Sequence, residues 1–229
     1  MLFLRTHRSI INTNASPTRG STALNTREHS TPLLLESVRI MDGVADLLPY
    51  HQQRMDRARR RHFPKTPVLK LEKLLSEVSI PTKGLFKFRL EYHHQPTKTE
   101  LLPYIMRPCN SIRLVDANEV SYRRKYADRS AIRKCLERKG DCDDILMVQN
   151  GHILDASYAN VALFDGKHWY TPAWPLLQGT RRACLLEKGT IRASVIRERD
   201  LPNFQLLRLV NSMLPWEEAP TLDISSVMR

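Results

Sequence analysis

The sequence contains no apolar run that approaches the roughly 18–20 residues of a membrane-spanning helix. Its longest apolar runs, at 32–35 and 144–148, have the length of buried strands. Cysteine is scarce, and its spacing predicts no zinc site, because no Cys-x-x-Cys or close Cys/His pair occurs. Cysteines this sparse are typical of a reducing compartment, so we expect a cytoplasmic protein. The four cysteines are Cys109, Cys135, Cys142 and Cys184.

Acidic residues are few relative to basic ones. The 229 residues include 36 Lys and Arg against 24 Asp and Glu, which gives a formal net charge of +12. Such a surplus favours an anionic partner, either nucleic acid or a small molecule with carboxylate or phosphate groups. Five arginines fall between residues 54 and 61. A solvated basic helix face is the ordinary explanation of such a cluster, and a non-catalytic nucleic-acid-binding module is the alternative.

Residues 1–31 differ in composition from the rest of the chain. They contain one acidic residue, Glu28, and show no sustained helical or strand period. This fits a transit peptide, a disordered extension or an incorrectly assigned start, so we exclude them from the fold prediction. The remaining length suits two domains. We predict a small α+β domain over 32–115 and a larger domain over 116–229.

Apolar periodicity and turn residues predict a mixed α+β or α/β fold with two lobes. A strand over 33–41 is followed by an Asp42-Gly43 turn, and a helix then runs over 49–62. Strands broken by paired turns, in a protein this basic, indicate a small-molecule site between the lobes. The later elements that we predict are a helix over 129–139, strands over 145–171, a helix from Thr180 and a helix over 203–213.

Three segments carry a more specific pattern. The first is the strand 36–43, followed by a helix with the motif His51-x-x-Arg54. The second, 122–130, places Lys125 just before a helix. In the third, 144–161, an Asn-Gly turn precedes Asp155, which lies 30 residues after Lys125. Together these segments resemble the class IV aminotransferase family, the fold-type IV enzymes that use pyridoxal 5′-phosphate (PLP), over roughly residues 33–225.

The resemblance implies a D-amino-acid-aminotransferase-like fold. PLP would lie in the cleft between two lobes, in a homodimer whose partner completes each site. The resemblance assigns the Schiff base with PLP to Lys125. A lysine beside two arginines is otherwise usually a surface residue, but burial and neighbouring cations would lower its pKa. Such a lysine can form the covalent bond and later move the α-proton of the substrate.

The same resemblance assigns the other cofactor contacts. Asp155 would keep the pyridine nitrogen of PLP protonated, although the family usually has the longer Glu at this position. The phosphate would contact Arg54 and a loop at a helix start, where backbone N–H groups favour an anion. Arg181 stands where family members often have threonine, so Thr180 or the backbone amides would bind the phosphate in its place. The implied cofactor contacts are Arg54, Lys125, Asp155, Asn160, Gly179, Thr180, Arg181, Asn211 and Ser212, and the implied substrate contacts are Glu36, Ser37 and Arg39.

The activity implied by the resemblance is that of a PLP-dependent lyase or aminotransferase. Residues 1–31 do not resemble the strand and Tyr-Gly loop with which many members begin, so the chain is similar to a short form of the family. This compactness and the basic surface favour a dicarboxylate substrate without a second substrate. We therefore expect a 4-amino-4-deoxychorismate lyase, which releases pyruvate and leaves 4-aminobenzoate for folate biosynthesis. The alternative is a branched-chain or D-amino-acid aminotransferase.

Overall fold

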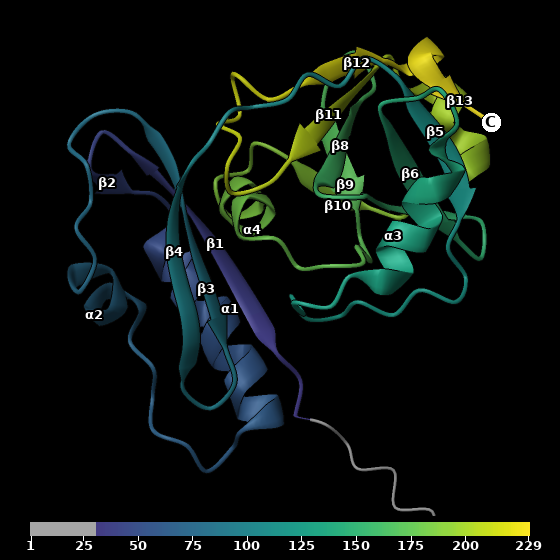
Figure 1. Ribbon diagram of the computed structural model, residues 1–229. Coiled ribbons are helices and arrows are strands. Elements are labelled where there is room, and N and C mark those ends of the chain that lie inside the picture. The colour runs from purple at the N-terminus through teal and green to yellow at the C-terminus, as the bar shows by residue number, and fades with distance from the viewer. Residues whose placement is uncertain (1–30) are drawn as a thin grey trace, which may run out of the picture. The chain divides into compact units, whose positions relative to one another are not determined.

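The structure is a computed structural model that describes residues 31–229 (Figure 1). The extension predicted over 1–31 lies outside the described residues, apart from Thr31. Residues Thr31–Arg229 form one compact unit. No helix in this described part of the chain is long and apolar enough to cross a membrane.

The first lobe, residues 34–103, is an antiparallel sheet with helices packed on one face. Val38 and Ile40 of the first strand are fully buried and pack against Met55 of α1, which explains the alternation of apolar residues in this strand. Asp42 and Gly43 have φ angles of 49° and 81°, as the two-residue turn of a tight hairpin requires. The sheet order is β2-β1-β3-β4, with β1 (Leu34–Met41), β2 (Val44–Ala45), β3 (Leu85–Tyr92) and β4 (Pro96–Pro103), and the helices are α1 (Leu48–His62) and α2 (Leu71–Ser76).

The second lobe, residues 112–229, contains two sheets that share an apolar core. Ile112 and Leu146 of one sheet pack with Val161 and Leu207 of the other. The first sheet has the order β13-β5-β6-β7, with β5 (Ile112–Asp116), β6 (Asp144–Gln149), β7 (His152–Ala156) and β13 (Val227–Met228). The second has the order β10-β9-β8-β11-β12, with β8 (Asn160–Phe164), β9 (Trp169–Pro172), β10 (Arg192–Ser194), β11 (Leu206–Val210) and β12 (Thr221–Asp223).

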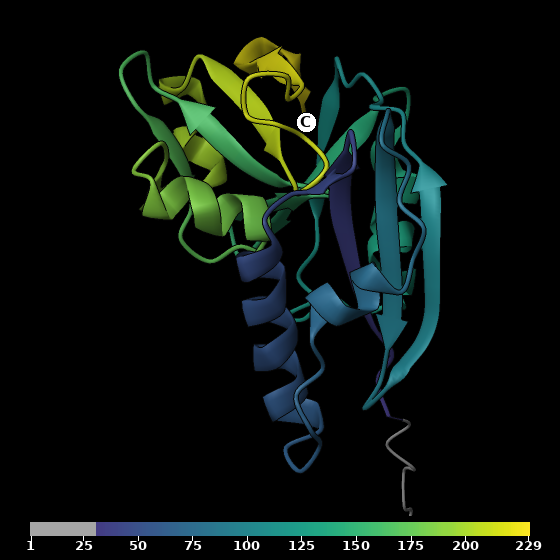
Figure 2. The same ribbon diagram turned by 90° about the vertical axis from the view of Figure 1, so that its left-hand side faces the viewer.

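Two α-helices of the second lobe, α3 (Ser130–Leu136) and α4 (Thr180–Glu187), begin close to motif residues. Lys125 lies shortly before α3, and Thr180 is the first residue of α4. The first turn of α1 lies beside α4 of the other lobe (Figure 2). There Tyr50 Oη donates a hydrogen bond to Glu187 Oε2 at 2.9 Å. The last residue of α4 is therefore held against the helix that carries His51 and Arg54.

The mixed class and the two lobes agree with the prediction, but the helix predicted over 203–213 is wrong. Residues Leu206–Val210 form β11, which pairs antiparallel with β8. Leu207 and Leu209 are fully buried in the core between the sheets, and Val210 packs on the other side near Leu185 of α4. Because both faces of β11 are covered, its apolar residues do not alternate with polar ones, and periodicity cannot distinguish such a strand from a helix.

Two boundaries also differ from the sequence prediction. β5, which we expected in the first domain, pairs parallel with β6 and so belongs to a sheet of the second lobe. β4 begins at Pro96, in a stretch for which we predicted no element. The predicted division between residues 115 and 116 remains a prediction.

Candidate active site

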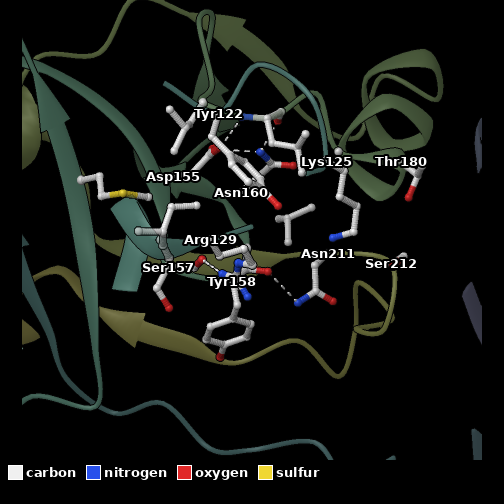
Figure 3. Close-up of a pocket in the computed structure, with 18 of the residues that line it drawn as sticks. Tyr122, Lys125, Arg129, Asp155, Ser157, Tyr158, Asn160, Thr180, Asn211 and Ser212 are labelled. Atoms are coloured by element: carbon white, nitrogen blue, oxygen red, sulfur yellow. Dashed lines mark hydrogen bonds between the residues drawn. The ribbon is translucent and has the colours of Figure 1, made fainter. Parts of the chain in front are cut away.

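One pocket receives side chains from both lobes. Arg54 comes from α1. The other lining residues come from the segment before α3 and its first turn, from β6 to β8, from the start of α4 and the loop before it, and from the end of β11 with the loop after it. Figure 3 shows the polar residues of the second lobe around this pocket. About 570 Å³ of space is free of protein atoms there. Its lining includes Arg54, Tyr122, Lys125, Arg129, Asp155, Ser157, Tyr158, Asn160, Gly179, Thr180, Asn211 and Ser212.

Lys125 extends its amine into the middle of this pocket (Figure 3). The backbone holds it there, because Leu35 N of β1 donates a hydrogen bond to Lys125 O at 2.8 Å. Burial, followed by the charge of Arg54, lowers the pKa of Lys125 to about 7, although Glu36 opposes this. A large share of the amine is therefore neutral at pH 7 and available as a nucleophile or proton acceptor.

Asp155 is a buried carboxylate fixed by two hydrogen bonds. Asn160 Nδ2 donates to Oδ1 and Leu177 N donates to Oδ2, both at 2.8 Å. Burial raises the pKa of Asp155 to about 7, against the opposing effect of the hydrogen bond from Asn160. A cationic partner in the pocket would restore its ionised form, and a protonated ring nitrogen is such a partner.

Arg54 is held by a network that connects the two lobes. Its Nε and Nη2 donate to the two oxygens of Glu36 at 3.0 and 2.5 Å. His51 Nδ1 contacts Glu36 Oε2 at 2.6 Å, and His51 Nε2 lies 3.4 Å from Thr180 Oγ1. Burial alone would raise the pKa of Glu36, but Arg54 and His51 lower it to about 2. Burial lowers the pKa of His51, so the imidazole is neutral at pH 7.

The end of the pocket near Thr180 has the donors that a phosphate group needs. It combines the guanidinium of Arg54, the hydroxyl of Thr180 and the N-terminus of α4, and Ser212 lines the same end. Ser212 is fixed by donating its hydroxyl to Ser37 O at 2.8 Å. Gly179 has no substitute here, because an added Cβ would lie 2.0 Å from Asn160 Oδ1. This donor set fits the phosphate of PLP, and Lys125 and Asp155 fit its aldehyde and its ring nitrogen.

Four residues predicted for the site do not line this pocket. Glu36 is fully buried beneath Arg54, since it shares the core face of β1 with Val38. Ser37 contributes its carbonyl to Ser212. Arg181 points away from Thr180 on α4, and its guanidinium donates to Asp46. Arg39 and Arg181 line a separate surface pocket. We therefore correct the prediction that these four residues contact the ligand directly. Each either supports the pocket from outside it or has no part in it. The four are Glu36, Ser37, Arg39 and Arg181.

Sequence reasoning missed several lining residues that stand inside the quoted motifs. Tyr122 and Arg129 flank Lys125, and Ser157 and Tyr158 lie between Asp155 and Asn160. Their proximity to the predicted residues was the available signal. The sequence did not show that these side chains point into the pocket, because they lie in loops whose apolar residues follow no helical or strand period.

Comparisons with known proteins match this fold and these motifs. Residues 122–218 match the family model for amino-transferase class IV. An uncharacterized protein of Haemophilus influenzae is 33% identical over 183 residues, which cover 79% of this chain and 97% of the relative. The crystal structure of a proposed 4-amino-4-deoxychorismate lyase from Haemophilus somnus is 30% identical, with a TM-score of 0.76 over 80% of this chain and 96% of that chain. A hypothetical aminotransferase of Mycobacterium tuberculosis with PLP bound has 19% identity and a TM-score of 0.66, over 84% and 81% of the two chains.

Proposed function

The chain belongs to the class IV aminotransferase family, and we propose that it is a PLP-dependent enzyme that acts on an amino-acid-like substrate. One observation carries the proposal. Lys125 and Asp155, each with a pKa shifted to about 7, share a pocket whose far end has phosphate donors. Titratable groups shifted this far toward neutral pH are typical of catalytic sites.

Each residue has a defined part in this proposal. Lys125 binds the cofactor through Nζ, and Asp155 holds a proton on the ring nitrogen. Arg54, Thr180 and the N-terminus of α4 bind the phosphate, and Ser212 lines that end of the pocket. Bound PLP supplies an electron-withdrawing ring that stabilises negative charge on the substrate carbon next to the amine. Lys125 accepts the proton of that carbon, and its pKa near 7 allows it both to take and to return a proton.

Among the reactions of the family, we propose elimination of pyruvate from 4-amino-4-deoxychorismate. Support comes from the 30% identity with the Haemophilus somnus protein along nearly all of that chain. The net charge of +12 also favours a substrate with two carboxylates. The proposal includes a homodimer, as the resemblance implies, and a cytoplasmic location, as the sparse cysteines indicate. Light scattering would measure the oligomeric state.

A nucleic-acid-binding module has less support, because part of the basic segment 54–61 is used inside the protein. Arg54 is paired with Glu36. Arg59 is buried, and its guanidinium donates to the carbonyl oxygens of Pro67, His93 and His94. Both guanidinium groups are buried, so neither can reach the backbone of a nucleic acid at the surface, which leaves three of the five arginines for such a surface.

Product analysis tests the proposed reaction. The PLP-loaded protein is expected to release pyruvate and 4-aminobenzoate in equal amounts from 4-amino-4-deoxychorismate, with both products followed by chromatography. Lys125→Ala should abolish product, whereas Lys134→Ala, which changes an exposed lysine of α3, should not. Exchange of an amine between an amino acid and an oxo acid would instead make the protein an aminotransferase. A loaded protein inactive in both assays would contradict the proposal.

A further inference from the structure

The pocket contains a second arginine that the proposed function does not use. Arg54 and Arg129 both line it, and Arg54 has its counter-charge in Glu36. Arg129 forms no salt bridge within residues 31–229. A guanidinium in the wall of a pocket that is not paired with a carboxylate of the protein is suited to an anionic ligand, although the charge of the buried Asp144 attracts it at longer range.

Arg129 is fixed in place by the backbone of the loop before β8. It directly precedes α3, and its Nη2 donates to Ser157 O. Ser157 is held in turn, because its N–H lies 3.3 Å from Oδ2 of the buried Asp144. The one hydrogen bond to Ser157 orients the guanidinium and leaves its remaining N–H groups for a ligand.

The surroundings of Arg129 separate it from the phosphate end. In Figure 3, Lys125 Nζ lies between Thr180 on one side and Arg129 with Tyr158 on the other. Asn211 stands beside them, where its Nδ2 is 3.4 Å from Tyr158 O. The charge of Arg129 also helps to lower the pKa of Lys125, so the two side chains are close enough for their charges to interact.

We propose that Arg129 binds a carboxylate of the substrate and selects amines that carry one. The inference rests on the proposed function, since it requires a substrate held beside Lys125. A carboxylate accepts two parallel hydrogen bonds from a guanidinium, an arrangement that a neutral amide of the same shape cannot reproduce. Arg129 is thereby a specificity residue at the substrate side of Lys125, apart from the phosphate site.

The test compares 4-aminobenzoate with 4-aminobenzamide as probes of the PLP-loaded protein, with dissociation constants from calorimetry. The wild type is expected to bind the carboxylate at least about tenfold more tightly than the amide, as charge-assisted hydrogen bonds predict. Arg129→Gln should remove that preference, leave the affinity for the amide unchanged and retain an absorbance band of bound PLP. Arg129→Lys should retain part of it. Arg133→Gln, an exposed arginine of α3, is the matched control and should behave as wild type.

Several results would overturn the inference. Equal affinity of the wild type for the two probes, binding of neither probe, or an unchanged preference in Arg129→Gln would each do so. A shifted or lost PLP band in Arg129→Gln, with the preference retained, would place Arg129 on the cofactor. A wild type that never shows a PLP band would refute the proposed function itself, and that result is read before any probe is added.

Discussion

At the scale of single residues, Lys125 and Asp155 have pKa values displaced by the same cause in opposite directions. Burial disfavours charge, so it lowers the pKa of the amine and raises that of the carboxyl, each to about 7. The cationic neighbours Arg54 and Arg129 add to the effect on Lys125. The pocket thus prepares a neutral amine for attack before any ligand is bound.

The pKa of Lys125 predicts how fast the apoprotein captures pyridoxal, which carries no phosphate to titrate. Only the neutral amine attacks an aldehyde, so the rate should rise with pH and reach half its maximum near pH 7. Stopped-flow absorbance between pH 5.5 and 10 measures it. A rate that keeps rising between pH 8 and 10 would indicate a pKa near the ordinary 10.5 and would contradict the assigned environment.

At the scale of elements, one buried ion pair joins the cofactor site to the fold. Glu36 of β1 binds Arg54 and His51 of α1, and His51 reaches Thr180 at the start of α4. The resemblance implied that Glu36 contacts the substrate. In the structure Glu36 lies on the buried face of β1, at a position where an apolar residue would be usual. Its role there is to orient Arg54.

Glu36→Gln should therefore destabilise the protein. It leaves the charge of Arg54 buried without a partner, which typically costs about 3–5 kcal/mol of unfolding free energy. Glu198→Gln, which alters an exposed 3.9 Å contact with Arg229, should cost less than about 1 kcal/mol. Urea denaturation measures both, and equal effects would contradict the importance of the buried pair.

The same pair predicts a pH dependence of stability. The pKa of Glu36 is lowered from 4.5 to about 2 in the folded protein. Its contribution is therefore fully present above about pH 4.5 and is lost as the pH falls toward 2. Glu36→Gln should lose less stability than the wild type over that interval.

At the scale of the whole molecule, sequence patterns predicted much of the fold and part of the candidate site. Asn-Gly and Asp-Gly turns located the hairpins, and the resemblance to the class IV family implied Lys125, Asp155 and Thr180, which the structure brings to one pocket. The direction in which each side chain points was harder to predict. Arg181 follows Thr180 in sequence but turns away on the helix, and Arg129 faces the pocket from a loop. Tertiary packing, which covers both faces of β11, also determined an element that local propensity misjudged.

Reduction of the PLP-loaded protein with borohydride, followed by peptide mass mapping, tests the central claim most directly. The account predicts that borohydride removes an absorbance band near 400–430 nm and leaves the mass of PLP on the peptide that contains Lys125. Label on another lysine, or a protein that stays colourless after incubation with PLP, would contradict it.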